Sequence, residues 1–288
     1  PNPAVIQAAQ FLPERSVDEV LNAFAGSLVG PSHAQALVAA WTSFEQALGG
    51  QPLVGLYCVF GYCWQRTWDR PFVPDPEAVP AADREYYERH GCFQQNNPGL
   101  NDLGKDVLFD LITRESGAKM AADMDANVIA PLKVLIAHLN QTLSSLAGQP
   151  AVVFTDLRDR VRAYLHWVTS LRNVCAWCEN VYGYLDAKSD AATKAACEKK
   201  LQAAIDLELA NIRGLIELLE TTPHEVLVLS GVAENTFFYG ENLTKILKTK
   251  IQLTEKYRHA KPRIDRDIYW RPIPGTVWPE GWSASATT

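Results

Sequence analysis

The order of hydrophobic and polar positions predicts one helix after another over most of the chain. Ser16 is a favourable N-cap residue, Asp18 and Glu19 follow it in a first helical turn, and Gly30 and Pro31 stop this helix. Further helices are expected over about residues 32–48 and 240–258, and another begins at about residue 101. A helical stretch is also expected from about residue 116 to Gly148, with a kink or a new start at Pro131.

The strongest periodic signal is a pair of long helices, expected at about residues 155–187 and 190–219. Apolar residues advance along both by steps of three and four, which is close to heptad spacing. They are Leu157, Val161, Tyr164, Val168, Leu171, Cys175, Cys178 and Leu185, then Cys197, Leu201, Ile205, Leu209, Ile212, Ile216 and Leu219. The connection at about residues 188–189 is so short that the helices must fold back on each other. The pattern therefore predicts an all-α helix bundle built around a long antiparallel hairpin.

Two proline-rich regions interrupt the helical pattern. Residues 52–101 contain six prolines, which leave room for only a short helix at about 81–89 and for an extended segment at 53–62. The tail, 262–288, carries three tryptophans among its prolines and cannot be regular helix. We expect a single domain, 1–288, with an irregular insertion at about 51–104 and this irregular tail.

Composition and charge restrict the class of protein. Of 288 residues, 47% are hydrophobic, which suffices for a large core, and the net charge of -6 is spread without a basic stripe. Nucleic acid and anionic membranes are therefore not expected as partners. The longest apolar run, 52–62, is too short to span a bilayer, so we expect a soluble protein, with a cytoplasmic and a periplasmic location both open. The chain starts without Met or a signal sequence, which suggests a piece of a longer protein or a mature form.

The cysteines and histidines do not predict a metal site. Cys175 and Cys178 form a CxxC pair, but both lie in mid-helix on the apolar stripe, and the chain has no second pair. Buried thiols are the preferred interpretation of the six cysteines, with a disulfide, a metal site or redox chemistry as alternatives. No HExxH, GxGxxG, P-loop or GxSxG motif occurs, so we expect neither a metal nor a cofactor.

Two stretches rich in aromatic residues, 66–99 and 231–242, are the candidate binding surfaces. Proteins often hold sugars between aromatic rings and amide or carboxylate groups, because C–H faces stack on rings while hydroxyls form hydrogen bonds. The candidate substrate-binding residues are Trp68, Asp69, Arg70, Tyr87, Glu234, Asn235, Tyr239, Glu241 and Asn242. The alternative is that these rings only cover the ends of the bundle.

Acid–base chemistry needs no linear motif, so catalytic residues stay open. Asp69, Glu234 and Glu241 are candidates for the paired carboxylates of glycoside cleavage. Glu208 and Asn211 lie three residues apart on one flank of the second long helix, beside its apolar stripe.

Several segments resemble a known class of protein. Residues 68–74 (WDRPFVP), 96–98 (NNP) and 106–109 (DVLF), and later 230–234 (SGVAE), 239–242 (YGEN) and 262–265 (PRID), are similar to the helical, non-barrel region of large multidomain bacterial glycoside hydrolases. The resemblance implies a helical domain that follows a catalytic barrel, with other domains of the same polypeptide and carbohydrate as partners. The sequence supplies no run of strands for the barrel itself.

Three classes of function remain open on the sequence. The leading one is an accessory helical domain of a bacterial carbohydrate-active enzyme, which packs on the catalytic domain or shapes its substrate site. The second is a free-standing helical enzyme that uses paired carboxylates. The third is a structural module for protein interaction, which would expose an apolar patch.

Overall fold

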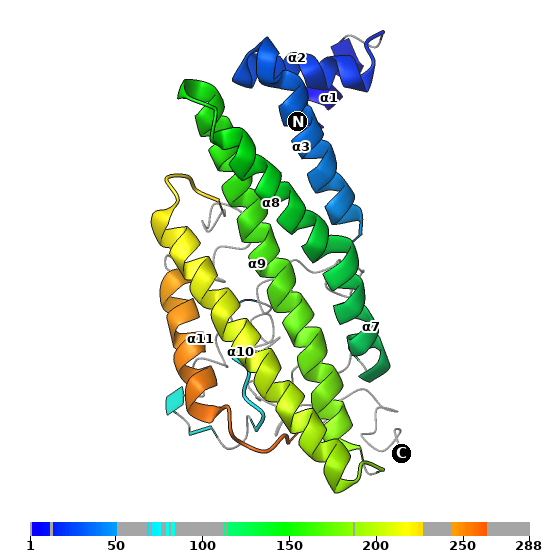
Figure 1. Ribbon diagram of the computed structural model, residues 1–288, viewed down its shortest axis with the longest axis vertical. Coiled ribbons are helices and arrows are strands. Elements are labelled where there is room, and N and C mark those ends of the chain that lie inside the picture. Colours follow the sequence, from blue (N-terminus) through cyan, green and yellow to red (C-terminus); the bar gives the residue numbers. More distant parts are fainter. Residues whose placement is uncertain are drawn as a thin grey trace, which may run out of the picture. The chain divides into compact units, whose positions relative to one another are not determined.

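The structure is a computed structural model in which every element formed by the described residues is a helix (Figure 1). It describes residues 2–11, 14–50, 68, 71–75, 79–80, 82–83, 112, 114–186, 188–226 and 243–263. The all-α expectation is confirmed for these residues. Within this part of the chain, no helix combines the length and the apolar character that crossing a membrane requires.

The chain divides into two compact units, which are described separately. Unit 1 comprises residues 1–52, 122–168 and 217–228, and unit 2 comprises residues 53–121, 169–216 and 229–288. Both units draw on segments that are far apart in the sequence. The expectation of a single domain over 1–288 stays a prediction.

Unit 1 begins with the helices α1 (Asn2–Phe11), α2 (Val17–Val29) and α3 (Pro31–Gly49). Helix α2 starts where the sequence predicts, because Ser16 and Glu19 form a capping box: the Glu19 amide donates to the Ser16 hydroxyl at 3.3 Å, and the Ser16 amide donates to the Glu19 carboxylate at 2.8 Å. Gly30, with φ of 80°, turns the chain directly from α2 into α3. Helix α1 was not foreseen from the sequence.

A π-helical turn precedes Pro131, where the sequence predicts a kink or a new start. Helix α7 (Arg114–Met124) continues through the π-helix η5 (Asp125–Ile129) into α8 (Ala130–Leu143). Proline has no amide hydrogen to donate to the Asn127 carbonyl four residues earlier, and the wider turn accommodates that loss. The backbone at Gly50 approaches this carbonyl so closely that a Cβ atom there would lie 2.5 Å from the Asn127 oxygen.

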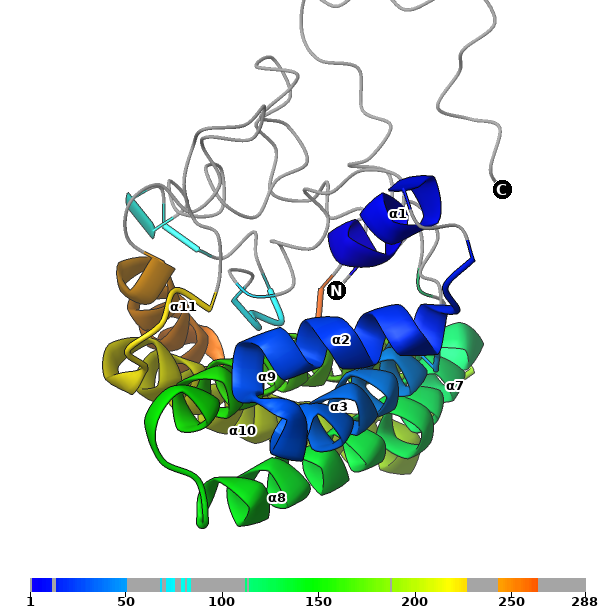
Figure 2. The same ribbon diagram turned by 90° about the horizontal axis from the view of Figure 1, so that it is seen from above.

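The predicted hairpin is formed by α9 (Gly148–Leu185) and α10 (Ala191–Thr221). Within unit 2 the pairing is antiparallel, since Ser170 contacts Glu208 and Asn211 whereas Gly183 packs against Cys197 (Figures 1 and 2). Helix α9 begins earlier than predicted because proline is tolerated in a first helical turn, where Pro150 lies. The last helix, α11 (Leu243–Tyr257), packs along α10, to which the ion pairs Arg213–Glu255 and Arg258–Asp206 connect it.

The core of unit 2 includes residues from the irregular insertion. Phe72 is fully buried and its ring lies 5.1 Å from that of Trp177 on α9, measured between centroids. Val73 and Val79 form a small cluster with Leu253 of α11. These described parts of the insertion therefore pack on the bundle.

Candidate functional site

A buried carboxylate, Glu208 on α10, lies at the centre of a polar network in unit 2. Its side chain is 0% exposed. Oε1 accepts hydrogen bonds from the Ser170 hydroxyl at 2.8 Å and from Lys250 Nζ, and Oε2 accepts one from Asn173 Nδ2 at 2.9 Å. Asn211 extends this Glu208 network, because its Nδ2 donates to the Ser170 oxygen at 3.0 Å.

The partner cation, Lys250, comes from α11 and is also buried, with 1% of the residue exposed. Besides its ion pair with Glu208, Nζ lies 5.6 Å from the centroid of the Phe72 ring, within the range of a cation–π contact. The backbone amide of Phe72 in turn donates to Thr254 Oγ1 on α11 at 3.1 Å. The insertion, α10 and α11 thus all meet at Lys250.

Helix α9 contributes a buried polar face to this site. Ser170, Asn173, Trp177 and Asn180 follow one another by steps of three and four residues, so they lie on one side of the helix, and all four are buried. The Trp177 indole nitrogen has no hydrogen-bond partner among the described residues. A helix with an apolar stripe and a buried polar stripe is packed on more than one side.

The geometry of the Glu208 network explains how two charges can remain in the core. Removing an ion pair from water is costly, and the cost is offset only when the remaining hydrogen-bonding capacity is satisfied. Both Glu208 oxygens have donors, and one of these donors is a cation. The network fixes the register of α9, α10 and α11. Sliding α10 or α11 by a turn would separate the two buried charges, and sliding α9 would remove two of the donors to the Glu208 carboxylate.

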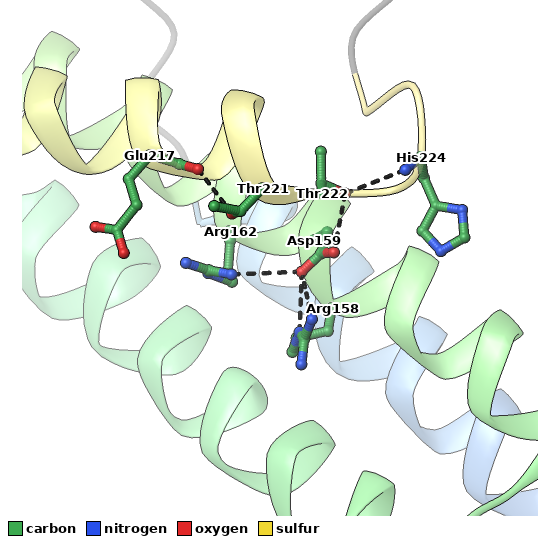
Figure 3. Close-up of polar contacts among 7 residues, drawn as sticks. All are labelled: Arg158, Asp159, Arg162, Glu217, Thr221, Thr222 and His224. Atoms are coloured by element: carbon green, nitrogen blue, oxygen red, sulfur yellow. Dashed lines mark hydrogen bonds and ion pairs between the residues drawn. The ribbon is translucent and has the colours of Figure 1, made fainter.

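A second buried carboxylate, Asp159 on α9, organises a polar cluster in unit 1 (Figure 3). Oδ1 accepts from Arg158 Nε at 2.9 Å and lies 3.5 Å from Arg162 Nη1, while Oδ2 accepts from the Thr222 hydroxyl at 3.0 Å. The Thr222 oxygen also accepts from the His224 backbone amide at 3.3 Å. Asp159, which is 1% exposed, therefore fastens the end of α10 to α9.

Apolar contacts also connect the end of α10 to α9 in unit 1. Ala163, Leu218 and Val226 form a buried cluster. Within α9, Arg160 donates a hydrogen bond to Asp156 at 2.9 Å, and this bond is the main cause that raises the pKa of Arg160 above its usual value. Glu208 and Asp159 thus each connect helices through contacts between residues that are far apart in the sequence.

The structure describes one of the nine predicted binding residues. Trp68 is buried, with 6% of its surface exposed, which agrees with the alternative that this ring packs on the bundle and argues against a sugar-stacking role for it. The other eight lie outside the described residues: Asp69, Arg70, Tyr87, Glu234, Asn235, Tyr239, Glu241 and Asn242.

Three of the six cysteines belong to the described residues, and all three are free buried thiols. Burial raises the pKa of Cys175 to about 12, so this thiol stays protonated and unreactive at neutral pH. Cys178 and Cys197 are buried as well, which confirms the preferred interpretation for the CxxC pair. Among the described residues, no group of histidine, cysteine, aspartate or glutamate side chains has the arrangement to hold a metal ion.

The sequence pattern contained part of the Glu208 network. The spacing of Glu208 and Asn211 had placed them on one flank beside the apolar stripe, where the structure finds them. The sequence pattern did not predict Ser170 and Asn173, because the apolar stripe of α9 does not include these polar positions. The regular spacing of buried polar residues on that helix was the signal that could have revealed them.

We also compared the chain with protein-family models, with curated proteins and with solved structures, and none of the three comparisons found a match.

Proposed function

We propose that the chain is a non-catalytic helical domain that assists a carbohydrate-active enzyme, by packing on its catalytic domain or by shaping its substrate site. The observation that carries the non-catalytic part is the closed Glu208 network in the core of unit 2. Its carboxylate is fully buried and accepts hydrogen bonds from three donors, so a substrate does not reach it.

Glycoside cleavage requires two carboxyl groups that reach the substrate from either side of the scissile bond, about 5 to 9.5 Å apart. Glu208 and Asp159 are both inaccessible to solvent, and each is held by donors from its own unit. Their arrangement favours rigidity over turnover. An accessory domain needs such rigidity, because it has to present a constant surface to its neighbour.

The carbohydrate part of the proposal rests on two arguments: the aromatic residues of the two candidate stretches, and the resemblance of several short segments, among them 68–74 and 239–242, to helical regions of glycoside hydrolases. Because Trp68 is buried, the proposal assigns sugar contacts to the other candidates, among them Tyr87 and Tyr239. Tyrosine suits this role, since its ring stacks on C–H faces while its hydroxyl forms hydrogen bonds.

Two assays on the purified chain test the two parts separately. The first measures hydrolysis of chromogenic glycosides and soluble polysaccharides, and we expect none. The second measures migration through native gels that contain soluble polysaccharides, and we expect retardation in at least one of them. Tyr239→Ala should reduce the retardation, whereas Tyr184→Ala, a change outside both candidate stretches, should not.

The two parts can fail independently. Turnover of a glycoside by the purified chain would overturn the non-catalytic assignment. Unretarded migration in every gel would overturn the carbohydrate assignment and would favour a structural module for protein interaction.

A further inference from the structure

A hollow opens in unit 2 between the first half of α10 and the segment that follows α11. Its volume is about 280 Å³, and the residues that give it its chemistry are Glu198, Lys199, Gln202, His259, Lys261 and Pro262. This volume lies just below the range of about 300 to 1,000 Å³ that is usual for small-molecule sites. From its size and its charge, we propose that this hollow binds a small molecule that carries an oxyanion, such as a carboxylate or a phosphate group.

The charge of the hollow is opposite to that of the whole chain. Lysines 199 and 261 both line it, against a single carboxylate, Glu198, whereas the chain as a whole has a net charge of -6. Lys261 is paired with Glu198, which raises the pKa of Lys261 and keeps it protonated. Lys199, which is exposed, has no ion-pair partner among the described residues and supplies the excess positive charge of the hollow. A small anion is the ligand that complements this balance.

The walls of the hollow are held in place by their own hydrogen bonds. The Gln202 side chain donates to the Arg258 backbone carbonyl at 2.7 Å and accepts from Arg258 Nε at 2.9 Å. The Arg263 amide donates to the Pro74 carbonyl at 3.0 Å, which connects the segment after α11 to the insertion. Because these contacts hold the backbone around the hollow, binding an anion requires little further ordering of it.

The Glu198–Lys261 pair gives the proposal a distinctive consequence. An incoming anion competes with Glu198 for the Lys261 ammonium group, so the carboxylate weakens binding. Removing the Glu198 charge should strengthen anion binding, whereas removing the Lys199 charge should weaken it. A neutral molecule of the same size should be insensitive to both changes.

The test is a titration followed by amide chemical shifts of the full chain in NMR spectra. The probes are inorganic phosphate, D-glucuronate and D-glucose, of which the last two differ by a carboxylate. We expect phosphate and glucuronate to shift amides of residues 198–202 and 259–261 in a saturable manner, and glucose to leave them unchanged. Lys199→Gln should weaken phosphate binding by roughly fivefold, as expected for one charged contact at a partly solvated site.

Neighbouring residues on α9 and α10 provide matched controls. Lys200 lies next to Lys199 but faces Glu179, with 4.0 Å between Nζ and Oε1. Lys200→Gln should therefore leave phosphate binding unchanged, and Glu179→Gln should not reproduce the strengthening expected of Glu198→Gln. Equal effects of Lys199→Gln and Lys200→Gln on phosphate binding would mean that phosphate responds to the general surface charge, and this would overturn the proposal. Glucose binding as strong as glucuronate binding would also overturn it. So would amides at the hollow that do not shift with phosphate or glucuronate.

This inference stands apart from the proposed function. A chain that binds phosphate at the hollow but migrates freely in every polysaccharide gel would retain the anion site and refute the carbohydrate assignment. The reverse result would refute only the anion site.

Discussion

Replacing Lys250 by methionine tests the interpretation of the Glu208 network most directly. Methionine has a similar length and no charge, so Lys250→Met removes the cation while it keeps most of the packing against Phe72. Glu208 then stays in the core with the Ser170 and Asn173 donors, at 2.8 and 2.9 Å, but without its counter-ion.

The expected loss follows from the burial of the remaining carboxylate. Breaking a buried ion pair by removing one partner costs about 3–5 kcal/mol, because an uncompensated charge is left in the core. Since Glu208 and Lys250 are 0% and 1% exposed, water cannot replace the ammonium group without local opening. A domain with a typical stability of about 5–15 kcal/mol would lose a large fraction of it.

Urea denaturation followed by far-UV circular dichroism measures this loss. The double variant Glu208→Gln/Lys250→Met should recover much of the stability, because it removes both charges, the glutamine oxygen still accepts from Ser170, and the Asn173 amide can turn to present its oxygen to the glutamine NH2 group. Lys256→Met is the control on the same helix: it breaks the exposed pair between Lys256 and Asp83 and should leave the denaturation midpoint nearly unchanged.

Two outcomes would refute the reasoning on the network. A loss below about 1 kcal/mol for Lys250→Met would mean that Glu208 gains solvent or another partner at little cost. Equal destabilisation by the single and the double variant would mean that shape, and not charge pairing, dominates at this site.

Two further predictions concern local contacts in unit 1. Gly50→Ala should destabilise by about 1–3 kcal/mol in the same urea assay, because the new Cβ would lie 2.5 Å from the Asn127 carbonyl oxygen, whereas Gly49→Ala, with nothing within 4 Å, should be neutral or stabilising. Ser16→Ala should cost about 1 kcal/mol by removing the cap of α2. The amide and hydroxyl of Ser16 lower the pKa of Glu19, so the stabilisation that the Glu19 carboxylate adds to the cap is fully present above the pKa of the unfolded carboxyl group and is lost as pH falls through the folded value. The hydrogen bond from the Glu19 amide to the Ser16 hydroxyl remains, so the cost of Ser16→Ala should shrink in acid but not vanish. A cost of Ser16→Ala that does not shrink in acid would contradict this.

The fold could be predicted in large part because its strongest signals are local. The capping box at Ser16, the stop at Gly30 and the near-heptad repeat of α9 and α10 depend on residues a few positions apart. Helix α1 escaped prediction because its segment has neither a clear apolar stripe nor a cap. The helix α9 begins at Gly148, earlier than the predicted start at about residue 155, because Pro150 fits a first helical turn.

The candidate site was less predictable, because its groups come from segments far apart in the chain. Spacing alone places Glu208 and Asn211 on one flank of α10, but it does not say that Lys250 lies opposite them. The aromatic stretch around Trp68 was considered mainly as a binding surface, with packing on the bundle as the alternative, and the burial of Trp68 favours packing for that ring.

By itself, the sequence determined that the described part of this chain is all-α and that α9 and α10 pair as an antiparallel hairpin, because helix periodicity and short connections are local properties. Only the tertiary structure decided that Glu208 meets Lys250 and that Asp159 holds the end of α10. The physical reason is that the energy of a buried charge depends on which groups surround it in space. Those neighbours are chosen by the packing of helices that no spacing along the chain encodes.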